Sequence, residues 1–386
     1  MDDLWIDYGE VMKLVLRHRD LESTLPYESF MSYPFTAVLT CKGCAYNCIT
    51  CGGSCNAFKN FFNRDGPAHK SAMKLVEEIN IISEYFKAPI FLIGDLRQGG
   101  KKWAEDVLTG IKQSGLDNTL TYEIFDMIPD DWMKKLAEST PNWTLEISPE
   151  SHDDRLRQIM GKPYTTAQME DTIRNALDKG TTKIDLYFMV GLSSQTSESA
   201  LDSIDYTRHL YKKMENDSKI FSFVSPMAPF LDPGSMVYEN PSKYGFTKLY
   251  HNLREHKEAL YQPSWKLYLS YHTDWMTRDQ VAETTYEAMI RLNQLKMDVG
   301  ITSQLHGEKV NYGLNMARDI MHRIDDIIAS TDDPKERQSK YDSLKQEIDE
   351  AKKSTVLAKR ELRMPGLAGI RVKGAVSYLL KYLGLS

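Results

Sequence analysis

The sequence lacks any long apolar run: no segment of its 386 residues approaches the roughly 18 consecutive apolar residues that a membrane span requires. The first 20 residues, MDDLWIDYGEVMKLVLRHRD, mix charged with apolar residues, and they contain neither the apolar stretch nor the small-residue cleavage site of a secretory signal. These absences disfavour membrane and secreted proteins. We therefore expect a soluble, cytoplasmic protein.

Two common functional motifs are also missing. No G-x4-G-K-[ST] phosphate-binding loop occurs, and the nine histidines form neither H-x3-H nor H-E-x2-H pairs, so they are not expected to be metal ligands. The formal net charge of −6, from 48 basic and 54 acidic residues, argues against a protein that coats nucleic acid. A small molecule or a protein stays open as the substrate.

Cysteine is scarce: the chain has five, and all of them lie between residues 41 and 55. Thiols crowded into one short segment cannot cross-link distant parts of a fold, which argues for a reducing compartment. Cys44, Cys48 and Cys51 follow the spacing C-x3-C-x2-C, and Cys41 and Cys55 flank them. Three thiolates on one loop can hold three irons of a cubane cluster and leave the fourth iron open to another ligand.

Two other metal sites fit this segment less well. A zinc ribbon separates its two C-x2-C pairs by about 15–20 residues, whereas only three residues intervene here. The bacterial ferredoxin run has a different order of gaps and a proline after its last cysteine. A zinc-stabilised binding module and an iron–sulfur electron carrier stay open as alternatives. Cys41 and Cys55 are interpreted as ordinary thiols outside the site.

Short β-rich runs alternate with stretches of helical periodicity from residue 36 to about residue 226, which is typical of βα units and a parallel sheet. The predicted strands are 36–39, 89–93, 120–125, 143–148, 183–190 and 220–225. The predicted helices between them are 71–87, 102–115, 129–138, 166–179 and 197–214. Thr165 and Ser197 are expected N-caps, and Gly180 is expected just after a helix end. The fold class is therefore α/β, a partial (β/α)6 TIM-like barrel with a helical C-terminal extension.

Beyond residue 226 the chain becomes rich in Pro and Gly and then helical, with predicted helices at 243–260, 275–297, 308–329 and 334–361. Aromatic residues between 261 and 272 are expected to pack in the core, with the lining of a substrate cavity as the alternative. The final basic amphipathic stretch, 370–385, is expected to pack on the protein. These patterns divide the chain into a linker-like segment 1–30, a core barrel 31–240 and a helical region 241–386.

The segment Cys44-Ala-Tyr-Asn-Cys48-Ile-Thr-Cys51, at the end of the first predicted strand, resembles the radical S-adenosylmethionine (SAM) superfamily. The resemblance covers residues 30–240 and is closest to cobalamin-binding members, some of which share the Cys-Gly-Gly-Ser run at 51–54. It implies a [4Fe-4S] cluster on the three cysteines and SAM chelated at the open iron. It also implies that one-electron reduction cleaves SAM to methionine and a deoxyadenosyl radical, which then starts chemistry on a substrate the sequence does not identify.

The resemblance also assigns SAM contacts, because loops after the strands build the site of a parallel barrel. Gly94-Asp95 resembles the family's turn that receives the SAM ammonium, with an ordinary βα turn as the alternative. The segment 153–162, DDRLRQIMGK, resembles the family's S-D-R-V-L-x-x-M-x-K helix, and Ser151 just before it has a helix N-cap as its alternative role. The assigned cofactor-binding positions are Gly94, Asp95, Glu123, Ser148, Glu150, Ser151 and Gly191.

Further partners follow from the same resemblance. It implies an external electron donor of the flavodoxin or ferredoxin type, and it raises methyl transfer as a reaction. Only about 35 residues precede the core, and the chain has no Asp-x-His-x-x-Gly cobalamin signature. Cobalamin is therefore expected to bind only through a missing or separate domain, and neither a membrane nor nucleic acid is expected as a partner.

Overall fold

A six-stranded parallel sheet forms the centre of the computed structural model, which describes residues 35–354 and, outside this range, residues 1–5, 7, 10, 14, 17, 18, 371, 376 and 380. Its strands are β1 (Thr36–Leu39), β4 (Ile90–Ile93), β5 (Leu120–Ile124), β6 (Trp143–Glu150), β7 (Lys183–Val190) and β8 (Ile220–Pro226). They pair in this order, so β1 and β8 are the two edges of the sheet. The partial barrel predicted from the sequence is confirmed.

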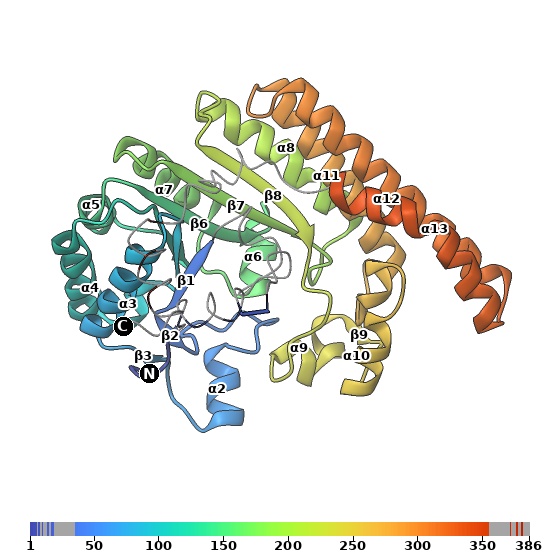
Figure 1. Ribbon diagram of the computed structural model, residues 1–386, viewed down its shortest axis with the longest axis horizontal. Helices are drawn as coiled ribbons and strands as arrows, with labels where there is room; N and C mark the ends of the chain where they lie inside the picture. Colours follow the sequence, from blue (N-terminus) through green and yellow to red (C-terminus); the bar gives the residue numbers. More distant parts are fainter. Residues whose placement is uncertain are drawn as a thin grey trace.

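Helices cover the outer face of the curved sheet (Figure 1). They are α3 (Ala72–Tyr85), α4 (Lys101–Ser114), α5 (Asp130–Ser139), α7 (Thr166–Asp178) and α8 (Ser197–Lys213). Thr165 caps α7 as predicted, and Gly180 has the expected positive φ, +85°, just after its end. The prediction for Ser197 is wrong by one residue. Thr196 has the extended backbone of an N-cap and caps α8, whereas the Ser197 hydroxyl accepts a hydrogen bond from Thr284.

The two faces of the strands differ in chemistry. Leu145, Ile147 and Leu186 are fully buried in the core that includes the covering helices. At the alternating positions, Glu146 of β6 is in register with Glu123 of β5 and with Asp185 of β7. Because successive side chains of a strand point to opposite faces, these three acids share the inner face of the barrel. The inner face of the barrel is therefore polar where these three acids lie.

Short elements lie around the carboxyl ends of the strands. They are β2 (Cys41–Lys42), α2 (Cys55–Phe62), β3 (Ala68–His69), the 3-10 helix η1 (Leu96–Gly99), α6 (Asp154–Met160), α9 (Met236–Glu239) and the 3-10 helix η2 (Pro241–Tyr244). β2 and β3 pair antiparallel beside the cysteine-rich loop. These elements come from segments far apart in the sequence and surround one end of the barrel.

The C-terminal part adds β9 (Phe246–Lys248), α10 (Leu253–Leu260), the 3-10 helix η3 (Trp265–Tyr268), β10 (Tyr271–Thr273), α11 (Arg278–Asp298), α12 (Gln304–Ser330) and α13 (Pro334–Ser354). The predicted helix 243–260 is wrong before residue 253. Gly245 has a φ of +71°, which ends η2, and the next residues pair with β10 instead. Figure 1 shows α11 and α12 beside β8, with α13 extending outward.

Three further predictions have mixed outcomes. Among the aromatic residues of 261–272, Tyr271 is buried as expected, whereas Tyr261 is 77% exposed. The boundary at residue 240 stays a prediction, although Phe246 and Val281 from beyond it share one buried cluster with the strands. Most of segments 1–30 and 370–385, and residues 355–361 of the last predicted helix, lie outside the described residues. Within the described part, no helix has the length and apolar character of a membrane span.

Candidate cofactor site

The cysteine loop follows β1 and ends at the N-terminus of α2. Two successive turns hold its centre, because the Cys51 amide donates to the Cys48 carbonyl at 3.2 Å and the Ser54 amide donates to the Cys51 carbonyl at 3.3 Å. The Ser54 hydroxyl then caps α2. The loop is also bonded to a segment far away in sequence, because the Ile49 amide donates to the carbonyl of Met160 at 3.2 Å. The loop therefore has a defined shape and is attached to the end of α6.

The thiols of Cys44, Cys48 and Cys51 lie close enough to influence one another. Burial, with a smaller contribution from the neighbouring Cys48 and Cys51, raises the pKa of Cys44 to about 12. Burial also raises the pKa of Cys48 and of Cys51. Backbone amides donate to two of the sulfurs, Tyr46 N to Cys44 Sγ at 3.4 Å and Gly53 N to Cys51 Sγ at 3.3 Å. Three partly buried thiols, two of which accept from backbone amides, provide the ligand chemistry that an iron–sulfur cluster needs.

The spacing of these sulfurs also bears on the type of metal. Among the residues that the structure describes, no group of three or more His, Cys, Asp or Glu side chains is arranged to hold one metal ion. A zinc ion requires its ligands around a single atom, whereas each thiolate of a cluster binds a different iron. Cys44, Cys48 and Cys51 are free thiols, and the cluster that they are expected to hold stays a prediction.

Gly94 and Glu123, both predicted to contact SAM, are brought together at the ends of β4 and β5. The Gly94 amide donates to Glu123 Oε2 at 2.7 Å, and Gly94 has a φ of +100°. A Cβ at this position would lie 2.8 Å from Thr40 Oγ1 and 3.0 Å from Cys41 Sγ. Both the backbone angle and the lack of space therefore require glycine here. Burial raises the pKa of Glu123, while the amide of Gly94 opposes this shift.

Asp95 already has partners within the protein. One of its oxygens accepts from the Arg97 guanidinium at 2.9 Å, and the other accepts from the Phe125 amide at 3.0 Å. Arg97 in turn donates to the carbonyl of Met127 at 2.8 Å. Asp95 thus ties the end of β4 to the segment after β5. Its contact with SAM stays a prediction.

Glu150, at the end of β6, sits in a buried ion pair beside the cysteine loop. Its backbone φ is +66° and its side chain is 7% exposed. Lys162 Nζ lies 3.2 Å from Glu150 Oε1, while Oε2 has no hydrogen-bond partner among the described residues. Burial alone would lower the pKa of Lys162, but the charges of Glu150 and Cys48 outweigh it and raise that pKa. A permanent positive charge therefore lies next to the thiol of Cys48.

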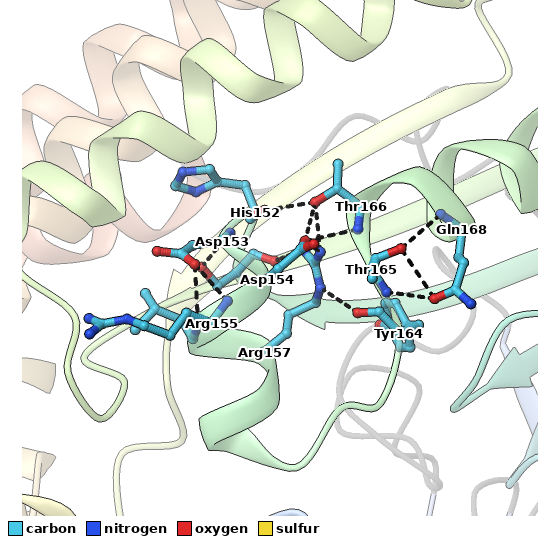
Figure 2. A network of polar contacts seen from close by, with 11 residues as sticks. His152, Asp153, Asp154, Arg155, Arg157, Tyr164, Thr165, Thr166 and Gln168 are labelled. Carbon is cyan, nitrogen blue, oxygen red and sulfur yellow. Dashed lines mark hydrogen bonds and ion pairs between the residues drawn. The ribbon is translucent and has the colours of Figure 1, made fainter.

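A polar network around Arg157 holds the segment that carries Lys162 (Figure 2). The guanidinium of Arg157 is fully buried and donates to the Ser151 carbonyl at 2.7 Å and to the Tyr164 carbonyl at 3.2 Å. It also pairs with Asp154, whose carboxylate accepts from the Thr166 hydroxyl at 2.6 Å. Asp153, rather than Ser151, caps α6. Ser151 therefore contributes its carbonyl to this network, and the N-cap alternative for it is wrong.

Two neighbouring loops make close contacts with the cysteine loop. A Cβ on Gly161 would lie 2.7 Å from the carbonyl oxygen of Asn47, and this glycine has a φ of +92°. The Gly52 amide donates to Asp232 Oδ2 at 3.1 Å. The loop after α6 and the loop after β8 thus both fix the cysteine loop. Sequence reasoning assigned none of Lys162, Gly161 and Asp232 to the site, although the M-x-K end of 153–162 was a signal for Lys162.

The other two predicted positions differ in their surroundings. Ser148 is partly exposed on β6, on the same face as Glu146. Gly191, after β7, donates its amide to Gln195 Oε1 at 2.8 Å, and a Cβ there would lie 3.2 Å from the Tyr271 hydroxyl. The Gly191 turn is therefore packed against β10. Contacts of both residues with SAM stay predictions.

Inside the barrel, a cavity of about 330 Å³ is lined by Glu146 together with Lys183 and Asp185, which form an ion pair at 2.9 Å. Burial raises the pKa of Glu146 to about 8, and the nearby charges of Glu123 and Asp185 add to this shift. Sequence reasoning missed this row of acids. Its signal was one acidic residue inside each of three neighbouring predicted strands.

Replacing Glu146 with glutamine is expected to change how stability depends on pH. The folded-state pKa of Glu146 lies above its ordinary value of 4.5, so its protonation favours the folded state at low pH, and this stability is lost as pH rises from about 5 to 8. Over that range the free energy of unfolding of the unmodified protein should fall by about 3–4 kcal/mol more than that of Glu146→Gln. Urea denaturation at pH 5, 6.5 and 8 measures this. The exposed Glu308→Gln on α12 is the control, and an identical pH dependence for Glu146→Gln would contradict the expectation.

The geometry thus defines a partial α/β barrel with a cysteine-rich loop at the carboxyl ends of its strands. Residues 38–207 match the family model described as the radical SAM superfamily. This part of the chain is therefore similar to radical SAM proteins, in agreement with the resemblance of the cysteine segment.

Two curated relatives are archaeal. An uncharacterized methyltransferase of Pyrococcus horikoshii is 27% identical over 218 residues, which are 56% of this chain and 44% of that protein. An uncharacterized protein of Methanocaldococcus jannaschii is 33% identical over 104 residues, which are 27% of this chain and 22% of that protein. The chain thus spans less than half the length of either relative.

Two solved structures resemble part of this chain. The radical S-adenosylmethionine methyltransferase TsrM from Kitasatospora setae is 13% identical with a TM-score of 0.43, and the match covers 60% of this chain and 45% of TsrM. The cobalamin-dependent S-adenosylmethionine radical enzyme OxsB is 12% identical with a TM-score of 0.43, and the match covers 90% of this chain and 50% of OxsB.

Proposed function

We propose that this protein is a radical SAM enzyme, in which Cys44, Cys48 and Cys51 hold a [4Fe-4S] cluster. The observation that carries the proposal is the set of three partly buried thiols on the loop after β1, within the residues that match the radical SAM model. When bound, the cluster and SAM supply a one-electron reductive cleavage that starts radical chemistry on a substrate. An external flavodoxin or ferredoxin would deliver the electron.

The protein's own residues would bind and orient SAM at the ends of the strands. The carboxylate of Glu123 is buried beside the Gly94 turn and can accept from the SAM ammonium or from a sugar hydroxyl. Glu150 has one buried oxygen that accepts no hydrogen bond from the part of the chain that the structure describes, and this oxygen can accept a further hydrogen bond. Lys162 places a cation beside Cys48, where it opposes the negative charge of thiolates. Ser148 and Ser151 follow on the same strand end and complete the proposed set with Asp95 and Gly191.

The direct test is the release of deoxyadenosine. The protein is purified anaerobically, its cluster is reconstituted, and SAM and dithionite are added. We expect deoxyadenosine to form only when all three components are present. An intact cluster that gives no deoxyadenosine and does not respond to SAM would support an electron carrier instead, and one zinc per chain would support a binding module.

The similarity to the uncharacterized methyltransferase of Pyrococcus horikoshii extends the proposal to methyl transfer. In that case cobalamin would be supplied by a domain outside this chain. The test uses SAM with an isotope-labelled methyl group, with and without added methylcobalamin. Label that leaves SAM for cobalamin or for an added substrate supports methyl transfer, and label that stays in SAM and methionine argues against it.

A further inference from the structure

A cavity of about 460 Å³ lies among the C-terminal helices α11, α12 and α13 and the 3-10 helix η3. Buried apolar side chains of this part of the chain form two clusters apart from the main core, one with Tyr286, Leu314 and Met321 and the other with Ile320 and Ile324. Side chains of both clusters line the cavity, so it lies where the two clusters meet. Folded interiors contain few voids larger than a water molecule, whereas small-molecule sites have volumes of about 300–1,000 Å³. The size of this cavity is therefore that of a ligand site.

The walls of this cavity carry no charge in the part of the chain that the structure describes, because none of the residues that line it is acidic or basic. Charged side chains of the same elements pair with one another instead. Arg318 lies 2.8 Å from the carboxylate of Glu283, and Lys266 Nζ lies 2.9 Å from that of Asp279. A charged ligand would lose its hydration in the cavity without gaining a partner of opposite charge, which is costly. The cavity therefore favours an uncharged ligand.

Two hydroxyl groups give one side of the cavity hydrogen-bonding capacity. Trp265 and Tyr286 both line it, and Trp265 Nε1 donates to the Tyr286 hydroxyl at 2.8 Å. The indole N–H is thus used within the protein, whereas the hydroxyl proton of Tyr286 has no acceptor among the described residues. Burial raises the pKa of Tyr286, so this hydroxyl stays protonated. Ser264, which is 6% exposed and precedes Trp265, adds a second hydroxyl that has no partner in the described part of the chain.

We propose that this cavity binds an uncharged, mainly hydrocarbon molecule that carries one hydrogen-bond acceptor. The acceptor would take a hydrogen bond from Tyr286 or Ser264, and the hydrocarbon part would lie against the aliphatic side chains of α12, which are Ile320, Met321 and Ile324. Burial of apolar surface gives the affinity, and a hydroxyl that gains an acceptor orients the molecule. The ligand would fill the space between the two apolar clusters. Its binding requires neither an iron–sulfur cluster nor SAM, so this site does not depend on the function proposed above.

The first test compares two ketones, methyl octyl ketone and methyl butyl ketone, by isothermal titration calorimetry on the full chain without iron or SAM. The four additional methylenes should each raise the affinity about threefold to fourfold, so methyl octyl ketone should bind about 100-fold more tightly. Decanoate and decyltrimethylammonium carry a charge that the cavity does not compensate, and they should bind at least about tenfold more weakly than methyl octyl ketone. Methyl octyl ketone that binds no more tightly than methyl butyl ketone would overturn the apolar part of the proposal. A charged probe that binds as tightly as methyl octyl ketone would overturn the choice of an uncharged ligand.

The second test uses variants of the cavity walls. Ala317 of α12 lines the cavity, and Ala317→Phe should weaken binding of methyl octyl ketone about tenfold or more, because the new ring takes up the space of the ligand. Ala329→Phe, at an exposed position of the same helix, is the matched control and should leave the affinity unchanged. Tyr286→Phe should weaken methyl octyl ketone about threefold to tenfold through the lost hydrogen bond, but not butylbenzene, which has no carbonyl. Binding of methyl octyl ketone that neither Ala317→Phe nor Tyr286→Phe changes would overturn the proposal. If a variant does not fold, the comparison of probes on the unmodified protein decides.

The two proposals can fail separately. Deoxyadenosine formation by a protein that does not bind methyl octyl ketone would overturn only the ligand site. Binding of methyl octyl ketone by a protein whose intact iron–sulfur cluster does not cleave SAM would overturn only the radical SAM function.

Discussion

Replacing Cys48 with alanine should remove the cluster and lower deoxyadenosine formation by at least about 100-fold. Loss of a residue that only supports a metal ligand lowers activity by up to about 100-fold, and loss of a proposed ligand itself should lower it at least as much. The reason is that Cys48 is one of three thiols on a single loop, and two remaining thiolates cannot hold three irons. Iron and sulfide per chain after anaerobic reconstitution, together with deoxyadenosine formed from SAM and dithionite, measure the effect.

Cys55→Ala is the matched control for that experiment. Cys55 is the first residue of α2 and lies outside the C-x3-C-x2-C spacing, so its loss should leave iron content and deoxyadenosine within about twofold of the unmodified protein. Equal losses in the two variants would mean that the loop simply needs its thiols to fold. Full iron content in Cys48→Ala would remove Cys48 from the cluster.

Replacing Lys162 with methionine should destabilise the cluster-free protein by about 3–5 kcal/mol, the cost of leaving a buried charge without its partner. Lys162 and Glu150 are both almost fully buried and lie 3.2 Å apart, and the second oxygen of Glu150 already has no partner among the described residues. Without Lys162, the carboxylate must either stay buried and unpaired or take up a proton. Urea denaturation at pH 7 measures the change.

Two comparisons make the interpretation specific. Lys102→Met removes an exposed partner of Asp106 on α4 and should cost at most about 0.5 kcal/mol. The double variant Glu150→Leu with Lys162→Met removes both charges and should recover part of the loss, because an apolar pair can replace a buried ion pair. A double variant no more stable than Lys162→Met alone would show that the lost stability comes from packing and not from the unpaired charge.

The strands were the most predictable part of the fold. β1 and β7 have the bounds that their apolar and β-branched residues predicted, because both faces of a parallel strand are buried and little else competes for such a sequence. Thr165 was equally clear, since a Thr with Gln168 three residues later can form a reciprocal cap. The bounds of these two strands and the cap at Thr165 depend on residues that are close together in the sequence.

The failures have a tertiary origin. Residues 246–248 have helical neighbours in sequence, but they pair with β10 across more than 20 residues, which no local pattern indicates. The partners of Asp95 were likewise not indicated by the sequence: its oxygens accept from Arg97 and from the Phe125 amide, while its contact with SAM stays a prediction. Which of several acids meets an arginine depends on how the strand ends are aligned in space.

The candidate site shows the same division. The cysteine triplet was visible because its three ligands lie within eight residues of one another. Lys162 and Asp232, by contrast, reach the cysteine loop from distant loops, through Glu150 and Cys48 in one case and through the Gly52 amide in the other. Gly161 joins them because only the assembled fold shows how closely it approaches Asn47.

The most direct test of the central claim is electron paramagnetic resonance of the anaerobically reconstituted and reduced protein, recorded with and without SAM and combined with metal analysis. Three thiolate ligands and an open fourth iron predict about four irons per chain and a cluster signal that changes when SAM binds. A single zinc ion per chain, or a cluster signal that SAM leaves unchanged, would contradict the account.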